Sequence, residues 1–570
     1  MTTNLSNLPS QTMDWNWAQI ELCYKELAAT HLTPDTVQTW LENWTRLKQL
    51  LEEVYWRLYV ATTLDTTDQK AEHEYKAFFD NVYPKSLVAE QKLKIKLLKS
   101  GLTPSGLEIP LRNMRCEVEL YRESNVALIS KLYKLAGEYS KITGAQTVNW
   151  EGEEVPLAQL QPVYQNTDRE KRERAWRLAS RRQLADRATI NALWVKYLDV
   201  RRRVAINADL PDYRAYRWQR LLRFDYTPED CYQFHEAVEE VVVPAALRIY
   251  ERRRDRMGLP SVRPWDLDVD PFGRPPLQPF ETLQELESTV ATIFHQINPQ
   301  LGRYFQIMRA ENLLNLESRK GKAPGAYCTE FRVNRRPFVF MNASGTKDDV
   351  NTLLHETGHA FHVFETSQLP YHLQLQIPLE FMEVASIAME LLAQPYLESD
   401  KGGFYSQENA TRAAIHQLEQ IILFWPYITV VDAFQHWVYE NHEEATNPAN
   451  CDAVWSELWR RYMVGEDWDG LEDEMATIWQ NRIHIHQDPF YYVEYGLAQL
   501  AAVQIYKNSL QDHDRAIQAY RRALSLGGTV SLPELYATAG AKLAFDAGTI
   551  KEAVEFLEQR IEQLEVLDYA

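Results

Sequence analysis

The sequence has few cysteines, no long apolar run and a deficit of positive charge, and each shortage excludes a class of protein. Its five cysteines are odd in number and far apart, which indicates a reducing compartment rather than a disulfide framework. No run approaches the about 18 consecutive apolar residues of a membrane span. The first residues lack the basic and apolar segments of a secretory signal. We therefore expect a soluble, cytoplasmic protein without a membrane partner.

Acidic residues outnumber basic ones, and apolar residues are plentiful. The chain has 61 Lys and Arg against 80 Asp and Glu, a formal net charge of −19. A negatively charged surface repels the phosphate backbone of nucleic acids, so we expect no nucleic-acid partner. Hydrophobic residues make up 45% of the 570 residues and aromatic residues 12%. This composition can fill a large core, and it excludes disordered and collagen-like chains.

Apolar residues recur at helical spacing along most of the chain. In the stripe from Trp40 to Leu58 they are three and four residues apart, which predicts one buried helix face. A Pro-rich segment at 258–279 cannot continue a helix and predicts a loop. We expect a mainly α protein of two lobes, with an N-terminal helical lobe at 1–205 and a catalytic lobe at 206–570.

A few short segments predict strands instead. Residues 147–157 combine β-forming residues with a central Glu-Gly turn, which is typical of a hairpin. Residues 325–333 and 337–341 flank a turn-like Asn-Arg-Arg and predict a second pair of strands. This pair directly precedes the segment with the strongest chemical signal, so we expect a small sheet beside the active site.

That segment is TKDDVNTLLHETGHAFHVFET at 346–366. Its apolar residues follow a helical period, and Thr346 with Asp349 three residues later predicts a capping box at the start of the helix. His355 and His359 are four residues apart, so their imidazoles leave one helix face about 5–6 Å apart at Cβ. Two neutral imidazoles at this spacing can bind one Zn²⁺. Glu356 lies about 100° round the helix, beside such an ion, where a general base for an activated water is needed.

A catalytic zinc ion takes three protein ligands and leaves one position open for water. His362 and Glu365 are the nearest candidates for the third ligand. In the metzincin pattern of zinc enzymes the position of His362 is a glycine, which lets the chain turn back to the metal. Glu365 lies about 240° round the helix from His359 and faces elsewhere. We therefore expect the third ligand to come from another element.

A second carboxylate-rich helix is predicted at 378–397, within PLEFMEVASIAMELLAQPYL. Glu380, Glu383 and Glu390 are its candidate ligands. Glu383 and Glu390 share one face two turns apart. We favour Glu383 as the third ligand and assign Glu390 to orienting a ligating imidazole.

A third cluster, RIHIHQDPFYYVEYGLAQL at 482–500, concentrates phenol and imidazole groups. Its members are His484, His486, Tyr491, Tyr492 and Tyr495. Such donors can stabilise a developing oxyanion, typically by a few kcal/mol each. An aromatic-rich core helix would have the same composition, so composition alone leaves both interpretations open.

Together these blocks resemble the signature of the thimet oligopeptidase family, and most closely its bacterial oligoendopeptidase F-like zinc peptidases. The resemblance covers residues 110 to 560 and includes KGKAPGAYCTEF at 320–331 and PFVFMNASGTKDDV at 337–350, in the family's order. It implies a helical zincin-type metallopeptidase of two lobes, with a deep central channel and one Zn²⁺ per chain at its floor.

The resemblance also implies roles for single residues. His355, His359 and Glu383 match the family's metal ligands, and Glu356 matches its general base. The family's catalytic histidine falls on His484.

The substrate-contacting tyrosines of the family fall on Tyr492 and Tyr495. A gap of one residue would move these matches, so His486 and Tyr491 stay open as alternatives. A strand within 325–333 or 337–342 would pair with the substrate backbone, a mode that recognises peptides with little regard to sequence.

The sequence thus predicts a zinc endopeptidase that hydrolyses internal bonds of short, unfolded oligopeptides. The closest alternative is a zinc carboxypeptidase of related helical fold, which shares the HExxH motif and the downstream glutamate. The other alternative is a helical peptide-binding or scaffold protein with a vestigial motif.

Overall fold

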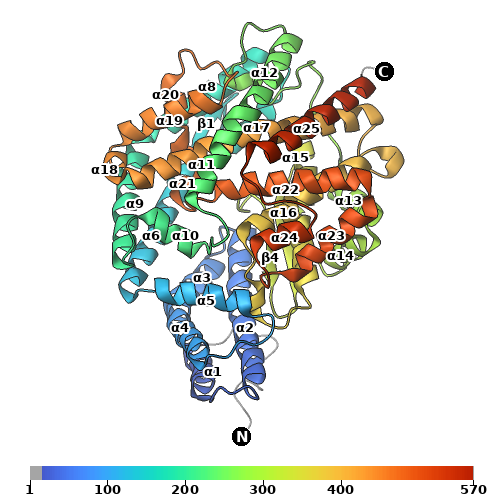
Figure 1. Ribbon diagram of the computed structural model, residues 1–570. Helices are drawn as coiled ribbons and strands as arrows, with labels where there is room; N and C mark the ends of the chain where they lie inside the picture. The colour runs from blue at the N-terminus through green and yellow to red at the C-terminus, as the bar shows by residue number, and fades with distance from the viewer. Residues whose placement is uncertain (1–15, 569–570) are drawn as a thin grey trace. The chain divides into compact units, whose positions relative to one another are not determined.

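The computed structural model describes residues 16–568, and helices dominate it (Figure 1). The mainly α class predicted from the sequence is confirmed. The chain forms two compact units, each built from three segments. The first unit comprises Met1–Glu119, Gln278–Ala410 and Ala501–Leu543, and the second comprises Leu120–Leu277, Thr411–Leu500 and Ala544–Ala570. The functional boundary between residues 205 and 206 stays a prediction.

The first unit contains the helices that carry the HExxH motif and the carboxylate-rich segment. Its helices are α1 (Trp17–Ala29), α2 (Val37–Leu64), α3 (Gln69–Asn81), α4 (Tyr83–Ser100), α5 (Glu108–Leu120), α13 (Leu283–Ile297), α14 (Pro299–Ala310), α15 (Lys347–Thr366), α16 (Leu379–Ala393), α23 (His513–Leu526) and α24 (Leu532–Thr538). Helices α1 to α4 are neighbours in Figure 1, and the apolar stripe from Trp40 to Leu58 lies largely in their shared core.

The second unit contains the hairpin and most of the remaining helices. The hairpin consists of β1 (Thr147–Trp150) and β2 (Glu153–Pro156), as predicted. The helices are α6 (Glu123–Gly144), α7 (Gln161–Tyr164), α8 (Arg169–Ala185), α9 (Arg187–Asn207), α10 (Tyr213–Arg220), α11 (Pro228–Ala237), α12 (Val243–Met257), α18 (His442–Ala445), α19 (Pro448–Tyr462), α20 (Glu472–Ala476), α21 (Ile483–His486) and α25 (Ala547–Asp568).

Two long helices contribute residues to both units. They are α17 (Gln407–Glu440) and α22 (Tyr492–Gln511). By length and composition alone, α17 could cross a membrane, but 72% of its most apolar window is buried within the protein. Such burial is also typical of a core helix in a globular protein.

A three-stranded sheet lies next to the HExxH helix in the first unit. Its strands are β3 (Leu314–Glu317), β5 (Arg336–Ala343) and β4 (Tyr327–Phe331), in that spatial order. β5 is parallel to β3 and antiparallel to β4, which leaves β4 at one edge. The sequence predicted β4 and β5 but missed β3, which is only four residues long. Helix α15 packs against β4 and β5.

Helix α15 begins where its sequence requires. The Thr346 hydroxyl accepts a hydrogen bond from the main-chain N–H of Asp349, and the Asp349 carboxylate accepts one from the N–H of Thr346 at 2.8 Å. The predicted capping box is therefore confirmed. It satisfies main-chain donors that the first turn cannot pair internally.

Helices α15 and α16 approach closely at Gly358, inside the HETGH motif. A Cβ atom at this position would lie 2.6 Å from the main-chain carbonyl oxygen of Ala385 and 2.6 Å from Cα of Ser386. Both contacts are to backbone, so the helices would have to separate to admit a side chain. Glycine thus sets the spacing between His355 and His359 on α15 and Glu383 on α16.

We expect Gly358→Ala to destabilise the protein by about 1–3 kcal/mol, the usual cost of overpacking. Gly137→Ala on α6 is the matched control, because a Cβ there meets no atom within 4 Å. Alanine favours a helix over glycine, so the control should be neutral or stabilising by up to about 1 kcal/mol. Urea unfolding of both variants measures the difference. Equal stabilities would show that the two helices can separate without cost.

Candidate metal centre

The structure brings His355, His359 and Glu383 together. Nε2 of His355 lies 3.6 Å and Nε2 of His359 lies 4.0 Å from Oε2 of Glu383. All three ligand atoms lie within 4.8 Å of one another. The two measured distances are too long for hydrogen bonds, yet they approach the about 3.4 Å between ligand atoms of a tetrahedral ion with 2.0–2.1 Å bonds. Two imidazoles and a carboxylate in this geometry fit a divalent ion of the zinc type.

Neighbouring side chains orient two of these groups. Nδ1 of His355 lies 2.7 Å from Oε1 of Glu390. This contact places a proton on Nδ1 and turns Nε2 toward Glu383, so Nε2 is the nitrogen that would bind a metal in exchange for its own proton. The Ser386 hydroxyl shares its one proton between the main-chain oxygen of Glu383 at 3.0 Å and Oε2 of its carboxylate at 3.2 Å, which restrains the carboxylate.

The two imidazoles differ in electrostatic environment. Burial disfavours the charged form of His355, but the hydrogen bond and charge of Glu390 outweigh it and raise its pKa to about 9. Burial lowers the pKa of His359 to about 4. The contrast arises because Glu390 lies against one ring and not the other.

Glu356 lies beside the ligand group, not within it. The main-chain N–H of Cys328, on the edge strand β4, acts on its carboxylate and lowers its pKa. Burial and the nearby carboxylates raise its pKa to about 7, although the charge of His355 acts in the opposite direction. A carboxylate in such surroundings is able to exchange a proton near neutral pH.

The other candidate ligands from the sequence do not belong to this group of three. The His362 ring packs against Phe381, with 5.9 Å between ring centroids, and burial lowers its pKa to about 3. Glu365 forms an ion pair of 2.7 Å with Arg521. Glu380 is buried on α16 but is not in the ligand group.

The tyrosine block belongs to the second unit, where its rings gather around His484. The ring centroid of His484 lies 5.0 Å from that of Tyr492, 5.3 Å from that of Tyr491 and 6.0 Å from that of Tyr495. His484 is half-buried in this cluster. The catalytic and substrate-binding roles assigned to these four residues stay predictions.

The structure separates His486 from this cluster. Its ring is fully buried and stacks on Tyr139 at 4.3 Å and on Trp479 at 5.9 Å. Burial lowers its pKa to about 3. His486 is therefore a core histidine, and of the two histidines only His484 is left as a candidate for chemistry.

A second group of metal-binding residue types is buried in the second unit. Cys231, Asp432 and His436 have potential ligand atoms within 4.8 Å of one another. However, Nη1 of Arg214 lies 3.2 Å from Nδ1 of His436. A guanidinium donates and never accepts, so Nδ1 must be the unprotonated nitrogen and Nε2 carries the proton. That tautomer leaves no lone pair for a metal at Nε2, so this group does not fit an ion.

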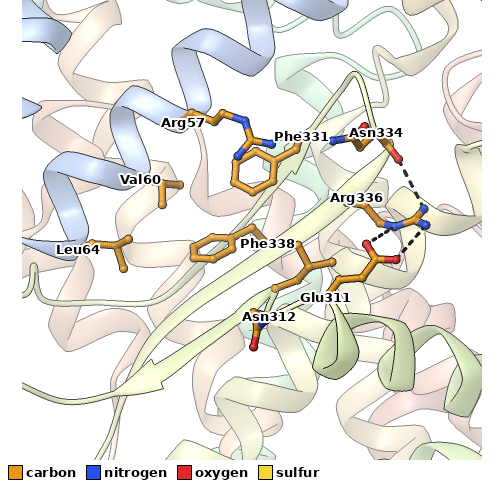
Figure 2. A pocket seen from close by; sticks show the side chains of 10 residues that line it. Arg57, Val60, Leu64, Glu311, Asn312, Phe331, Asn334, Arg336 and Phe338 are labelled. Carbon is orange, nitrogen blue, oxygen red and sulfur yellow. Dashed lines mark hydrogen bonds and ion pairs between the residues drawn. The ribbon is translucent and has the colours of Figure 1, made fainter. Parts of the chain in front are cut away.

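A cavity of about 580 Å³ lies between α2 and the sheet, away from the ligand group (Figure 2). Figure 2 shows Val60 and Leu64 of α2 on one side of it and Phe331 and Phe338 of the strands on the other. Its two arginines are already paired within the protein, Arg57 with Glu53 and Arg336 with Glu311. None of the three metal-ligand candidates lines it.

Sequence reasoning missed three contributors to the site. These are the Cys328 main-chain N–H, the Ser386 hydroxyl and the close approach at Gly358. The first depends on tertiary structure and has no sequence signal. The other two lie inside the blocks HETGH and EFMEVAS, where a small residue one helical turn from a ligand could have indicated them.

The model of peptidase family M3 matches residues 163–555. An oligoendopeptidase F homolog from Borreliella burgdorferi is 23% identical over 252 residues, which span 43% of this chain and 40% of that protein. Oligopeptidase PepF from Bacillus subtilis is 23% identical over 279 residues, 47% of this chain and 40% of that protein. The chain thus aligns with less than half the length of these two relatives.

Solved structures match over nearly the whole chain. PZ peptidase A, solved with an inhibitor, superposes with a TM-score of 0.89 at 28% identity, covering 97% of this chain and 98% of that one. Oligoendopeptidase F from Enterococcus faecium has a TM-score of 0.63 at 16% identity, covering 97% and 98%, and shows likeness of fold alone. The resemblance inferred from the sequence is confirmed, and the chain belongs to peptidase family M3, among the oligoendopeptidase F-like peptidases.

Proposed function

We propose that this protein is a zinc-dependent endopeptidase that hydrolyses internal bonds of short, unfolded oligopeptides. The observation that carries the proposal is the meeting of His355, His359 and Glu383 around one point, with Glu356 beside them. Family M3 membership and the peptidase names of the relatives support it. The five cysteines are free thiols, which is compatible with the cytoplasmic location that we propose.

The metal ligands and the general base have different roles in the proposed reaction. His355, His359 and Glu383 would hold the ion, which when bound supplies Lewis acidity and makes water more acidic. Glu390 holds the His355 ring so that Nε2 points at the ligand group. Glu356 takes a proton from the attacking water and passes it to the leaving amine, a task suited to a pKa near 7.

The tyrosine block supplies the remaining groups in this proposal. Tyr492 or His484 donates a hydrogen bond to the developing oxyanion. Tyr491 and Tyr495 contact the substrate. The outer edge of β4 pairs with the substrate main chain, because an edge strand presents unpaired N–H and C=O groups to an extended peptide. Such pairing recognises the main chain of a peptide rather than its side chains. Substrates would therefore be selected by their length rather than by their sequence.

Glu356→Gln and Glu383→Gln should fail in different ways. Loss of the base should lower kcat by about 10²–10⁴-fold with the metal retained. Loss of the ligand should remove the metal and the activity together. Metal analysis beside peptide kinetics distinguishes the two variants. If Glu356→Gln hydrolysed peptides at the normal rate, Glu356 would not be the general base.

Glu390→Gln should weaken metal binding by about 10–100-fold, the usual effect of losing a carboxylate that orients a ligating histidine. A competition titration against a chelator measures the affinity. Glu534→Gln, at an exposed position on α24, is the control and should leave it unchanged. An unaltered affinity in Glu390→Gln would mean that His355 needs no orienting partner.

Cleavage of a peptide library with amidated C-termini tests the kind of peptidase. Mass spectrometry should find internal cuts in short peptides, and a chelator should abolish them. Removal of single C-terminal residues, from free peptides alone, would favour the carboxypeptidase alternative. Cutting of folded proteins would contradict selection by length.

A further inference from the structure

A buried lysine side chain lies at an irregularity in the three-stranded sheet. Lys322 belongs to the loop 318–326 that joins β3 to β4, and it is 9% exposed. Its ammonium nitrogen lies 3.0 Å from the carbonyl oxygen of Asn315 and 2.8 Å from that of Glu317, and it also donates to the carbonyl of Met341. All three acceptors are main-chain oxygens.

The ladder between β3 and β5 is interrupted at this point. Asn315 pairs with Phe340, but Glu317 pairs with Ala343, so between these two pairs β5 has one residue more than β3. At such a bulge the main-chain donors no longer align with the carbonyls opposite. A buried carbonyl without a donor is unfavourable. An ammonium carries three donors, and Lys322 thus supplies those that the ladder lacks.

A side chain in the bulge also forms hydrogen bonds with the loop 318–326. Asn342 lies in the bulge, and its side-chain amide donates to the carbonyl oxygens of Ala323 at 2.9 Å and Gly325 at 3.1 Å. The end of α2 adds a third attachment, since the N–H of Ala323 donates to the carbonyl oxygen of Thr63 at 2.8 Å. The loop is therefore fixed to β3, β5 and α2 immediately before it enters β4.

The environment of the ammonium shows that it is held away from water. Burial, and then the charge of Arg319, lower the pKa of Lys322 to about 8, with Glu317 acting in the opposite direction. The nitrogen also lies 4.3 Å from the ring centroid of Phe340, a favourable cation–π position. Desolvating an ammonium in this way is unfavourable unless its donors are all used.

We propose that Lys322 is a positioning residue that fixes the edge strand β4 for peptide binding. Its ammonium joins the β5 bulge to the loop 318–326, and the loop sets where β4 begins. β4 in turn presents its outer edge to an extended peptide. The inference rests on the proposed function, because the peptide is bound along β4 only in that proposal.

The experiment compares Lys322→Met with Lys320→Met. Methionine keeps the length and apolar stem but removes every donor, and Lys320 is an exposed lysine of the same loop. Each variant is assayed with a long peptide that can pair along β4 and with a truncated one that reaches little beyond the scissile bond. Metal content and amide hydrogen exchange at 327–331 are measured on the same preparations.

For Lys322→Met we expect kcat/KM to fall roughly ten- to hundredfold for the long peptide, mainly through KM, because a small misplacement of binding groups has effects of this size. The truncated peptide should lose much less, metal content should not change, and exchange at 327–331 should become faster. Lys320→Met should behave like the unaltered protein in every measurement.

An equal loss for both peptides, or no loss for either, with metal retained would overturn the role of Lys322 and leave the proposed function intact. That function fails separately, if the unaltered protein makes no internal cuts in peptides or if a chelator does not abolish them. Where Lys322→Met does not fold, Asn342→Ala tests the same attachment from β5. An unchanged ratio of long to truncated peptide in that variant also overturns the inference.

Discussion

The contact between α15 and α16 at Gly358 is the constraint on which the site depends. The two histidines come from one helix and the carboxylate from the other, so the distance between the helix axes sets the distance between ligand atoms. With a backbone carbonyl and a Cα where a side chain would be, the helices approach as closely as two backbones can. The short distance between the helices thereby places the Glu383 carboxylate opposite His355 and His359.

Two pairs of residues with the same spacing show how neighbours decide chemistry. His355 and His359 are four residues apart on α15, and Asp432 and His436 are four apart on α17. At His355 a carboxylate faces Nδ1 and holds a proton there, so Nε2 is the nitrogen that can exchange its proton for an ion. At His436 a guanidinium faces Nδ1, so the other nitrogen carries a proton and faces Asp432 at 3.4 Å. The spacing is the same in both pairs, but the second pair has Asp432 in place of a histidine, and a guanidinium instead of a carboxylate faces Nδ1 of its histidine.

Much of the site could be predicted because its determinants are local. The start of α15, the shared face of His355 and His359, and the place of Glu356 follow from the helical repeat within 346–366. Glu383 required one further step, to the next helix. By contrast, the burial of His486 depends on Tyr139, more than three hundred residues earlier, and the Cys328 N–H reaches Glu356 only through the sheet. Contacts of this kind leave no periodic pattern in the sequence.

The position of Asn342 has a consequence for how the protein can be made. Asn342, Ala343 and Ser344 form an acceptor sequence for N-linked glycans. A glycan on this amide nitrogen would replace one of the hydrogens that now serve the carbonyls of Ala323 and Gly325, and would add bulk beside a tight loop. A glycan attached to Asn342 in a eukaryotic secretory pathway would lie at the junction of β5 and the loop 318–326. Bacterial cytosolic expression avoids this modification.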